Sequence, residues 1–171
     1  MLLQITLSNF YSFKEPITLN FLATSDKSLE KNNIININQK IRLLKSIAIY
    51  GANASGKSNL LKAINFIKDF VLKKTPEKEI NLNNCKLSLE SEKNPTMAEL
   101  IFIADNKIHR YGFEINKEKV LKEWLYINFS NRESKIFYRD KNKITFGTKL
   151  SLSKRLLDIS NENTLFLTTL S

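Results

Sequence analysis

The residues best suited to chemistry in this sequence form one short run, Gly51-Ala52-Asn53-Ala54-Ser55-Gly56-Lys57-Ser58. Two glycines with this spacing, followed by Lys and Ser, are typical of a loop that binds phosphate groups. Glycine permits backbone angles that other residues resist, so successive N–H groups can point at one anion. Lys57 would reach the β- and γ-phosphates, and the Ser58 hydroxyl is an oxygen ligand of the kind that Mg²⁺ prefers. The run predicts a nucleoside triphosphate site, with ATP and Mg²⁺ as the expected ligands.

The elements on either side of this run are the ones that such a loop requires. Ser46-Ile47-Ala48-Ile49-Tyr50 is nearly continuously apolar, which predicts a short strand buried on both faces. After the loop, apolar residues recur at helical spacing (Leu60, Ala63, Ile64, Ile67 and Val71). Lys73, Lys74 and Pro76 favour the end of that helix. The helix N-terminus would add its positive dipole end to the phosphate site.

The rest of the sequence is richer in strand patterns than in helix patterns. Alternation predicts an antiparallel pair over residues 2–7 and 17–22, and a hairpin over 98–104 and 108–115 that turns at Asp105-Asn106-Lys107. Further strands are expected at 119–129, 135–139 and 143–146, and a short helix at 149–158. Residues 24–40 and 77–95 are polar without a clear period and are interpreted as loops.

Two segments carry a family resemblance. The stretch Tyr50 to Ile64, including Asn59 after the loop, resembles the phosphate loop of ABC-type ATPases in the RecF and SMC branch, although Ala54 stands where that group usually has glycine. The segment Ile5 to Phe13 looks like the opening strand and turn of the same group, with Tyr11 in place of a frequent arginine. The amino-acid sequence of the loop and the strand Tyr111-Gly112-Phe113-Glu114 most resemble those of AAA/ABC-like ATPases of abortive-infection and phage-defence systems.

The resemblance implies a fold, a ligand set and partners. The fold would be α/β: the N-terminal lobe of a P-loop NTPase of the ABC-head kind, with an antiparallel β-rich subdomain. ATP would be held by Gly51, Ala52, Asn53, Ala54, Ser55, Gly56, Lys57, Ser58 and Asn59, with Lys57 in the catalytic role, Ser58 on Mg²⁺ and Asn53 near the γ-phosphate. ATP would control a homodimer or head-to-head assembly, and a nuclease or other toxic effector would be the partner.

One partial head domain is expected over residues 1–171. Residues 1–75 would hold the strand pair, phosphate loop and helix, 96–148 the β-rich insertion, and 149–171 the start of a helical segment. The chain ends within an apolar segment, Asn163 to Ser171, which favours a fragment of a longer protein or a truncated gene.

Hydrolysis by an ABC-type enzyme also needs a strand ending in Asp-Glu and a signature motif, and neither is found. The Asp helps to hold Mg²⁺ and the Glu activates water. Leu100 to Asp105 is apolar and ends in Asp, but Asn106 and Lys107 follow it, so a hairpin turn explains it better. Leu156-Leu157-Asp158 lies in a helix-like segment and also lacks the Glu.

Other reactive or aromatic residues have plainer explanations than catalysis. His109 lies in an alternating strand without a second metal-ligand type nearby, and Cys85 has no motif around it and is expected to be inert. Trp124, Tyr126 and Phe129 could stack on bases, but strand packing accounts for them more simply.

Charge and composition leave the partner open. Lys+Arg 27 against Asp+Glu 17 gives a net charge of +10, which fits either a nucleic-acid surface or a general excess of scattered lysines. No apolar run approaches the ~20 residues of a membrane helix, and a single cysteine fits a reducing cytoplasm. No guanine-selecting motif is present, yet the loop alone does not distinguish ATP from GTP. Three functions therefore stay open: a defence ATPase, a RecF- or SMC-like DNA-associated ATPase head, and a non-hydrolysing nucleotide-binding module.

Overall fold

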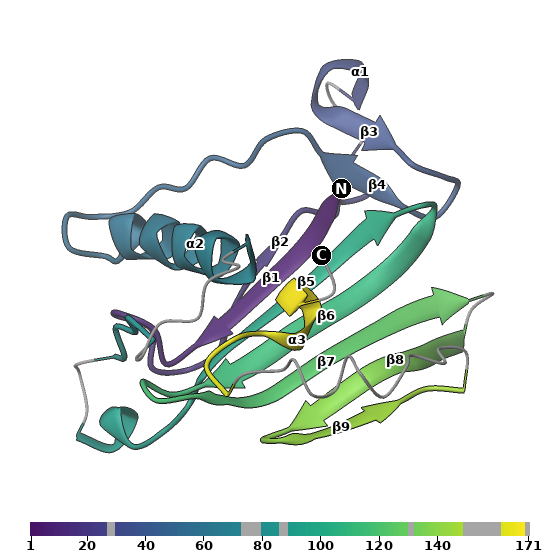
Figure 1. The fold of residues 1–171 in the computed structure, drawn as a ribbon. Coiled ribbons are helices and arrows are strands. Elements are labelled where there is room, and N and C mark those ends of the chain that lie inside the picture. Colours follow the sequence, from purple (N-terminus) through teal and green to yellow (C-terminus); the bar gives the residue numbers. More distant parts are fainter. Residues whose placement is uncertain (27–29, 73–79, 86–88, 130–131, 149–161, 170–171) are drawn as a thin grey trace.

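The computed structural model in Figure 1 describes residues 1–26, 30–72, 80–85, 89–129, 132–148 and 162–169. Its centre is a seven-stranded sheet in the order β2-β1-β5-β6-β7-β8-β9, and all neighbouring strands are antiparallel. The strands are β1 (Leu2–Ser8), β2 (Ile17–Asn20), β5 (Thr96–Ala104), β6 (Lys107–Ile115), β7 (Val120–Phe129), β8 (Arg132–Asp140) and β9 (Lys143–Phe146). The predicted strand pair, hairpin and later strands are thereby confirmed, and β1 joins them into one sheet by pairing with β5.

The main helix is α2 (Lys57–Leu72), as its apolar spacing predicts. It lies across one face of the sheet, together with the short α3 (Phe166–Thr169), and this face is called the inner face here (Figure 1). Leu60, Ala63 and Ile67 of α2 are buried in the main core, which also contains inward side chains of the strands. Burial of a Leu or Ile side chain contributes about 1.5–3 kcal/mol, so this contact fixes the helix on the sheet.

Residues 24–40 are not the continuous loop that the sequence predicts. They contain α1 (Glu30–Asn33) and β3 (Ile34–Asn36), and β3 pairs with β4 (Arg42–Leu44) in a separate two-stranded sheet. These elements span a single turn or a few residues, too short to show a period. A short 3₁₀ helix, η1 (Leu89–Glu92), likewise lies within the predicted loop 77–95, and the expected helix at 149–158 lies outside the described residues. No described helix is long and apolar enough to cross a membrane.

The predicted buried strand Ser46–Tyr50 is wrong for this structure. These residues form no strand, and Ile49 and Tyr50 are 43% and 90% exposed. Residues 46–50 make no backbone hydrogen bond to other described residues. A strand buried on both faces needs neighbouring strands and covering layers, and the β1–β9 elements do not supply them here. The apolar side chains of Ile49 and Tyr50 therefore remain largely exposed to solvent.

The opposite face of the sheet, called the outer face, carries polar and aromatic side chains. Trp124 lies against Gly112, where an added Cβ would come within 2.5 Å of the indole and 2.8 Å of the Ala98 carbonyl. The indole Nε1 donates to Glu99 (2.9 Å), and the Arg110 guanidinium lies over the Tyr126 ring at 4.5 Å. The predicted strand packing of Trp124 and Tyr126 is confirmed; the side chain of Phe129 lies outside the described part.

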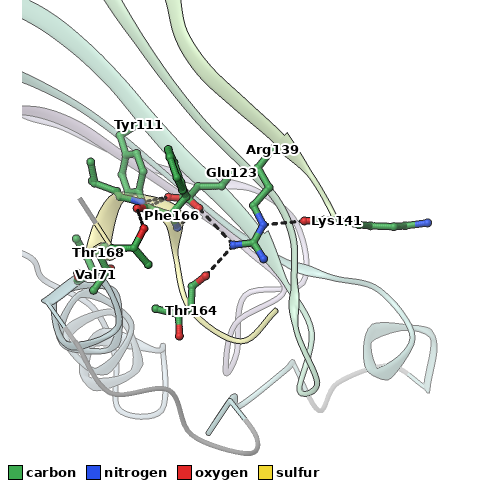
Figure 2. Close-up of polar contacts among 10 residues, drawn as sticks. Val71, Tyr111, Glu123, Arg139, Lys141, Thr164, Phe166 and Thr168 are labelled. Carbon is green, nitrogen blue, oxygen red and sulfur yellow. Dashed lines mark hydrogen bonds and ion pairs between the residues drawn. The ribbon is translucent and has the colours of Figure 1, made fainter. Parts of the chain in front are cut away.

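A buried polar network ties α3 to the inner face (Figure 2). The Glu123 carboxylate, which is fully buried, accepts hydrogen bonds from the Phe166 N–H (2.6 Å), the Leu167 N–H (2.9 Å) and the Tyr111 hydroxyl (3.0 Å). Arg139, 1% exposed, lies 3.9 Å from Glu123 and donates to the Thr164 carbonyl at 2.7 Å. The carboxylate thus caps the otherwise unpaired N–H groups at the start of α3.

The network also reaches the phosphate-loop helix. The Thr168 hydroxyl donates to the Val71 carbonyl (2.8 Å) near the end of α2 (Figure 2). Burial raises the pKa of the Glu123 carboxyl, and the hydrogen bonds from Leu167, Phe166 and Tyr111 oppose that rise. Burial also lowers the pKa of Arg139. The Glu123 carboxylate and the Arg139 guanidinium each favour the charged form of the other.

Replacing Glu123 tests this network. Glu123→Gln turns one acceptor oxygen into an N–H₂ donor that faces other donors, and it removes the buried negative charge that lies 3.9 Å from Arg139. We expect a loss of about 3–5 kcal/mol in the free energy of unfolding, measured by urea denaturation. The control is Glu133→Gln, which removes a half-exposed partner of Arg110 and should cost about 1 kcal/mol or less. Equal losses in the two variants would contradict the role given to Glu123.

Candidate phosphate-binding site

The candidate site is the loop Gly51 to Gly56 together with the first turn of α2. Lys57 is the first residue of the helix, so the loop leads directly into its N-terminus. N–H groups in the first turn of a helix have no intrahelical acceptor, and the helix dipole is positive there. Residues 51–55 and Ser58 are exposed, whereas Leu60 is buried. The helix is therefore anchored on its inner side while its N-terminal end remains accessible.

Both loop glycines lie close to neighbouring side chains. A Cβ on Gly51 would come within 2.7 Å of the Ser55 hydroxyl. Gly56 has a φ of +96°, and a Cβ there would lie 3.0 Å from Ser12 Oγ and 3.4 Å from the Phe13 ring. The backbone consequently turns tightly with no side chain in the way. Ala54 also has a positive φ, +64°, a conformation that is strained for a residue with a Cβ.

The loop presents backbone donors. Among residues 52–56, which form the bend, only the Ser55 N–H has an acceptor within the described structure, the Ala52 carbonyl at 3.3 Å. The N–H groups of Ala52, Asn53, Ala54 and Gly56 are left for a ligand. Successive free N–H groups in such a bend form a concave anion site.

The side chain of Lys57 folds back across the loop. Its ammonium group donates to the Gly51 carbonyl (2.6 Å) and the Ala52 carbonyl (2.7 Å). A cation is therefore held next to the free N–H groups. The exposed Ser58 hydroxyl, one residue further on, is accessible as an oxygen ligand for Mg²⁺. The donor set fits a Mg²⁺-bound polyphosphate.

The side chain of Asn59, like that of Lys57, is engaged within the protein. Its amide Nδ2 donates to Ser12 Oγ at 3.1 Å. Ser12 belongs to the turn after β1, whose residues Asn9 and Tyr11 have φ values of 52° and 50°. Sequence reasoning did not identify this contact. The available signal was Asn9, since Asn tolerates the left-handed conformation better than most residues.

Asn9 holds that turn in place. Its buried side chain donates to the carbonyls of Ser91 and Asn94 (2.7 Å each) and accepts from the Cys85 N–H (3.2 Å). Its own carbonyl accepts from the Thr96 hydroxyl (2.7 Å). Side-chain bonds therefore fix the turn beside Gly56 to the segment around η1 and to the first residue of β5.

The remaining sequence candidates lie away from the loop or in structural positions. Asp105 is in the β5–β6 turn, as predicted, with a φ of +48°. His109 stacks on Phe102 within the sheet and Cys85 is buried as a free thiol. No cluster of metal-ligating side chains occurs among the described residues, and Leu156 to Asp158 lie outside them.

A comparison with known families assigns the domain. The family described as "AAA domain, putative AbiEii toxin, Type IV TA system" matches residues 46–151, which is more than half of the chain and includes the whole phosphate loop. The chain belongs to this family. As an AAA domain it is a P-loop NTPase and a nucleotide-binding ATPase domain, on a mixed α/β fold with a mostly antiparallel sheet. A search of curated proteins gave no match.

Gly56 and Ala54, the two loop residues with positive φ, give opposite predictions for nucleotide affinity. Gly56→Ala adds a Cβ at positive φ against Ser12 and Phe13, so it should weaken nucleotide binding by about tenfold or more, corresponding to about 1–2 kcal/mol of strain. Ala54→Gly removes strain of the same kind and should preserve or improve binding. Titration calorimetry with ATP and Mg²⁺ measures both. Weaker binding in Ala54→Gly than in Gly56→Ala would show that the loop conformation is different.

Proposed function

We propose that this AAA domain binds ATP with Mg²⁺ through Gly51 to Ser58, as the N-terminal lobe of an ABC-type ATPase that regulates a phage-defence effector. The observation that carries the ATP assignment is the convergence of free loop N–H groups and the Lys57 ammonium at the N-terminus of α2. The loop N–H groups, the positive end of the α2 dipole and the Lys57 ammonium all lie at the same exposed part of the domain.

Each residue has a distinct part in this proposal. Lys57 exchanges its two carbonyl acceptors for oxygens of the β- and γ-phosphates, and Asn53 lies at the γ-phosphate end. The Ser58 hydroxyl holds Mg²⁺, which neutralises phosphate charge when bound. The Gly56 N–H and the first-turn N–H groups of α2 hold the remaining oxygens. Ser12 and Phe13 support the loop from behind.

Hydrolysis is proposed to require structure beyond the described residues. The Lys57 ammonium contacts carbonyl and hydroxyl oxygens, and no carboxylate among the described residues pairs with it. Ser46–Tyr50 is an apolar segment with the composition of a buried strand and no strand partner in this structure. Leu61 and Leu72 of α2 are 62% and 64% exposed. These features support a second β-structure, from the same polypeptide or another protomer, which pairs with Ser46–Tyr50 and supplies the acidic residues.

The defence role rests on the description of the matched family, which refers to a toxin of a type IV toxin–antitoxin system. A nuclease or other toxic effector regulated through an ATP-dependent homodimer is the proposed arrangement. The net charge of +10 favours a second candidate, a DNA-associated ATPase head of the RecF or SMC type. Salt-sensitive DNA binding that ATP strengthens would select the second candidate.

Loss of Lys57 tests nucleotide binding. Lys57→Ala should weaken ATP binding by at least about tenfold in titration calorimetry, because a charge-assisted contact to phosphate is lost. Ser58→Ala should abolish the gain in affinity that Mg²⁺ gives the unchanged chain, so EDTA should affect the unchanged chain but not this variant. Lys68→Ala, an exposed lysine on α2, is the control. Unchanged affinity in Lys57→Ala would refute the assignment.

Turnover provides an independent test. The purified chain should bind ATP and Mg²⁺ but release phosphate at a negligible rate, since water activation needs a carboxylate and none among the described residues pairs with Lys57. Phosphate release is followed with a coupled assay, with Lys57→Ala as the background. Robust hydrolysis that disappears in Lys57→Ala would mean that the catalytic groups are already present in this chain.

A further inference from the structure

The turn that follows β1, residues 9–13, lies along one face of α2. Three side chains of the helix each contact one residue of this turn: Asn59 with Ser12 (3.1 Å), Lys62 with the Tyr11 ring (5.5 Å to its centre) and Phe66 with the Phe10 ring (5.0 Å between centres). Spacings of three and four residues place side chains on the same side of a helix. The turn and the N-terminal part of α2 therefore pack as one unit.

The turn is held in place independently of the phosphate loop. The Phe10 N–H donates to the Phe13 carbonyl and the Phe13 N–H to the Phe10 carbonyl, at 2.9 Å each, which closes the turn. The Tyr11 N–H donates to the Asn83 carbonyl at 2.9 Å. Since these partners lie outside residues 51–58, the position of Ser12 does not depend on a bound nucleotide.

Ser12 lies next to the loop residue whose conformation matters most for an anion. Gly56 has a φ of +96°, and its carbonyl accepts the Leu60 N–H (3.0 Å), which begins the helix. Glycine adopts positive and negative φ about equally well, so Gly56 does not select this conformation by itself. The Ser12 hydroxyl lies 3.0 Å from the position that a Gly56 Cβ would take. Contact with Ser12 therefore restricts the rotation of Gly56 and the direction of its free N–H.

Asn59 in turn fixes the Ser12 hydroxyl. A serine side chain has three staggered rotamers, and a hydrogen bond to its oxygen selects one of them. The Asn59 Nδ2 supplies that bond from the first turn of α2, only three residues after Gly56. The amide nitrogen of Asn59 is thereby directed at the turn and is already used within the protein.

We propose that Ser12 and Asn59 are a positioning pair for the phosphate loop. Asn59 holds the Ser12 hydroxyl, Ser12 holds Gly56 at positive φ, and the Gly56 N–H is thereby directed at a phosphate oxygen. Neither side chain touches the nucleotide. This role rests on the proposed binding of ATP at the loop, and it replaces the direct ATP contact that the sequence predicts for Asn59.

A double-mutant cycle tests the pair by titration calorimetry with the full chain. Ser12→Ala and Asn59→Ala should each weaken the binding of ATP with Mg²⁺ about three- to tenfold, because the loop is less preorganised. Since Asn59 acts through Ser12, the double variant should bind no more weakly than Ser12→Ala alone. Inorganic triphosphate should lose affinity by the same factor as ATP, because Gly56 binds phosphate. Ser25→Ala and Asn65→Ala, the same substitutions at exposed positions, should leave both affinities unchanged.

The nucleotide-free chain provides a second readout. Nitrogen-15 relaxation gives the order parameter of the Gly56 amide, which is about 0.85 for rigid backbone. It should fall in Ser12→Ala and in Asn59→Ala, and it should stay unchanged in the two control variants. A variant that merely lost stability would lower its melting temperature without this local change at Gly56.

Four results would contradict the positioning role. Unchanged affinity in both single variants would show that the pair does not affect the loop, and additive losses in the double variant would show that Asn59 acts without Ser12. A loss for ATP but not for triphosphate would indicate contact with the sugar or base. An unchanged Gly56 order parameter would show that the pair does not restrain this residue.

Failure of the proposed ATP binding would give a different result. The unchanged chain would then not bind ATP, or Lys57→Ala would bind it equally well. The Gly56 order parameters would still decide whether Ser12 and Asn59 restrain the loop, because they are measured without nucleotide.

Discussion

The burial of one side of α2 against the inner face of the sheet fixes the position of the phosphate loop. Leu60, Ala63 and Ile67 lie in the core, whereas the N-terminal end of the same helix is exposed. Since Lys57 starts the helix and Gly56 precedes it, the direction of the helix axis determines where the free N–H groups point. The contact of Gly56 with Ser12 and Phe13 and the Thr168–Val71 hydrogen bond restrain the two ends of α2.

These restraints trace back to two buried polar groups. Asn9 fixes the turn behind Gly56 through its side-chain and carbonyl bonds, and Glu123 fixes α3 through its bonds to backbone N–H groups. In both places a buried side chain bonds to backbone groups that have no partner in a strand or helix. Such bonds are directional and are lost with a single substitution. The hydrophobic core holds α2 on the sheet of the AAA domain, while Asn9 and Glu123 fix the turn beside Gly56 and the helix α3.

Local patterns predicted much of this structure. The glycine spacing indicated the candidate site, the helical spacing after Lys57 predicted α2, and alternation predicted the antiparallel strands from β5 to β9. The errors have physical causes. Ser46–Tyr50 has the composition of a buried strand, but burial depends on neighbours that its own residues do not encode. The short β3–β4 hairpin has too few residues to show a period. The contacts of Asn9, Ser12 and Glu123 join residues that are distant in the sequence. Local sequence patterns therefore could not predict them.

The central claim is that the backbone N–H groups of the loop, with Lys57, hold the phosphates of ATP. Nitrogen-15 chemical shifts recorded during a titration with ATP and Mg²⁺ observe those groups one by one. The largest changes should occur at the amides of Asn53 to Ser58, and inorganic triphosphate should reproduce most of them. Small changes at these amides, with the main shifts elsewhere in the chain, would contradict the account.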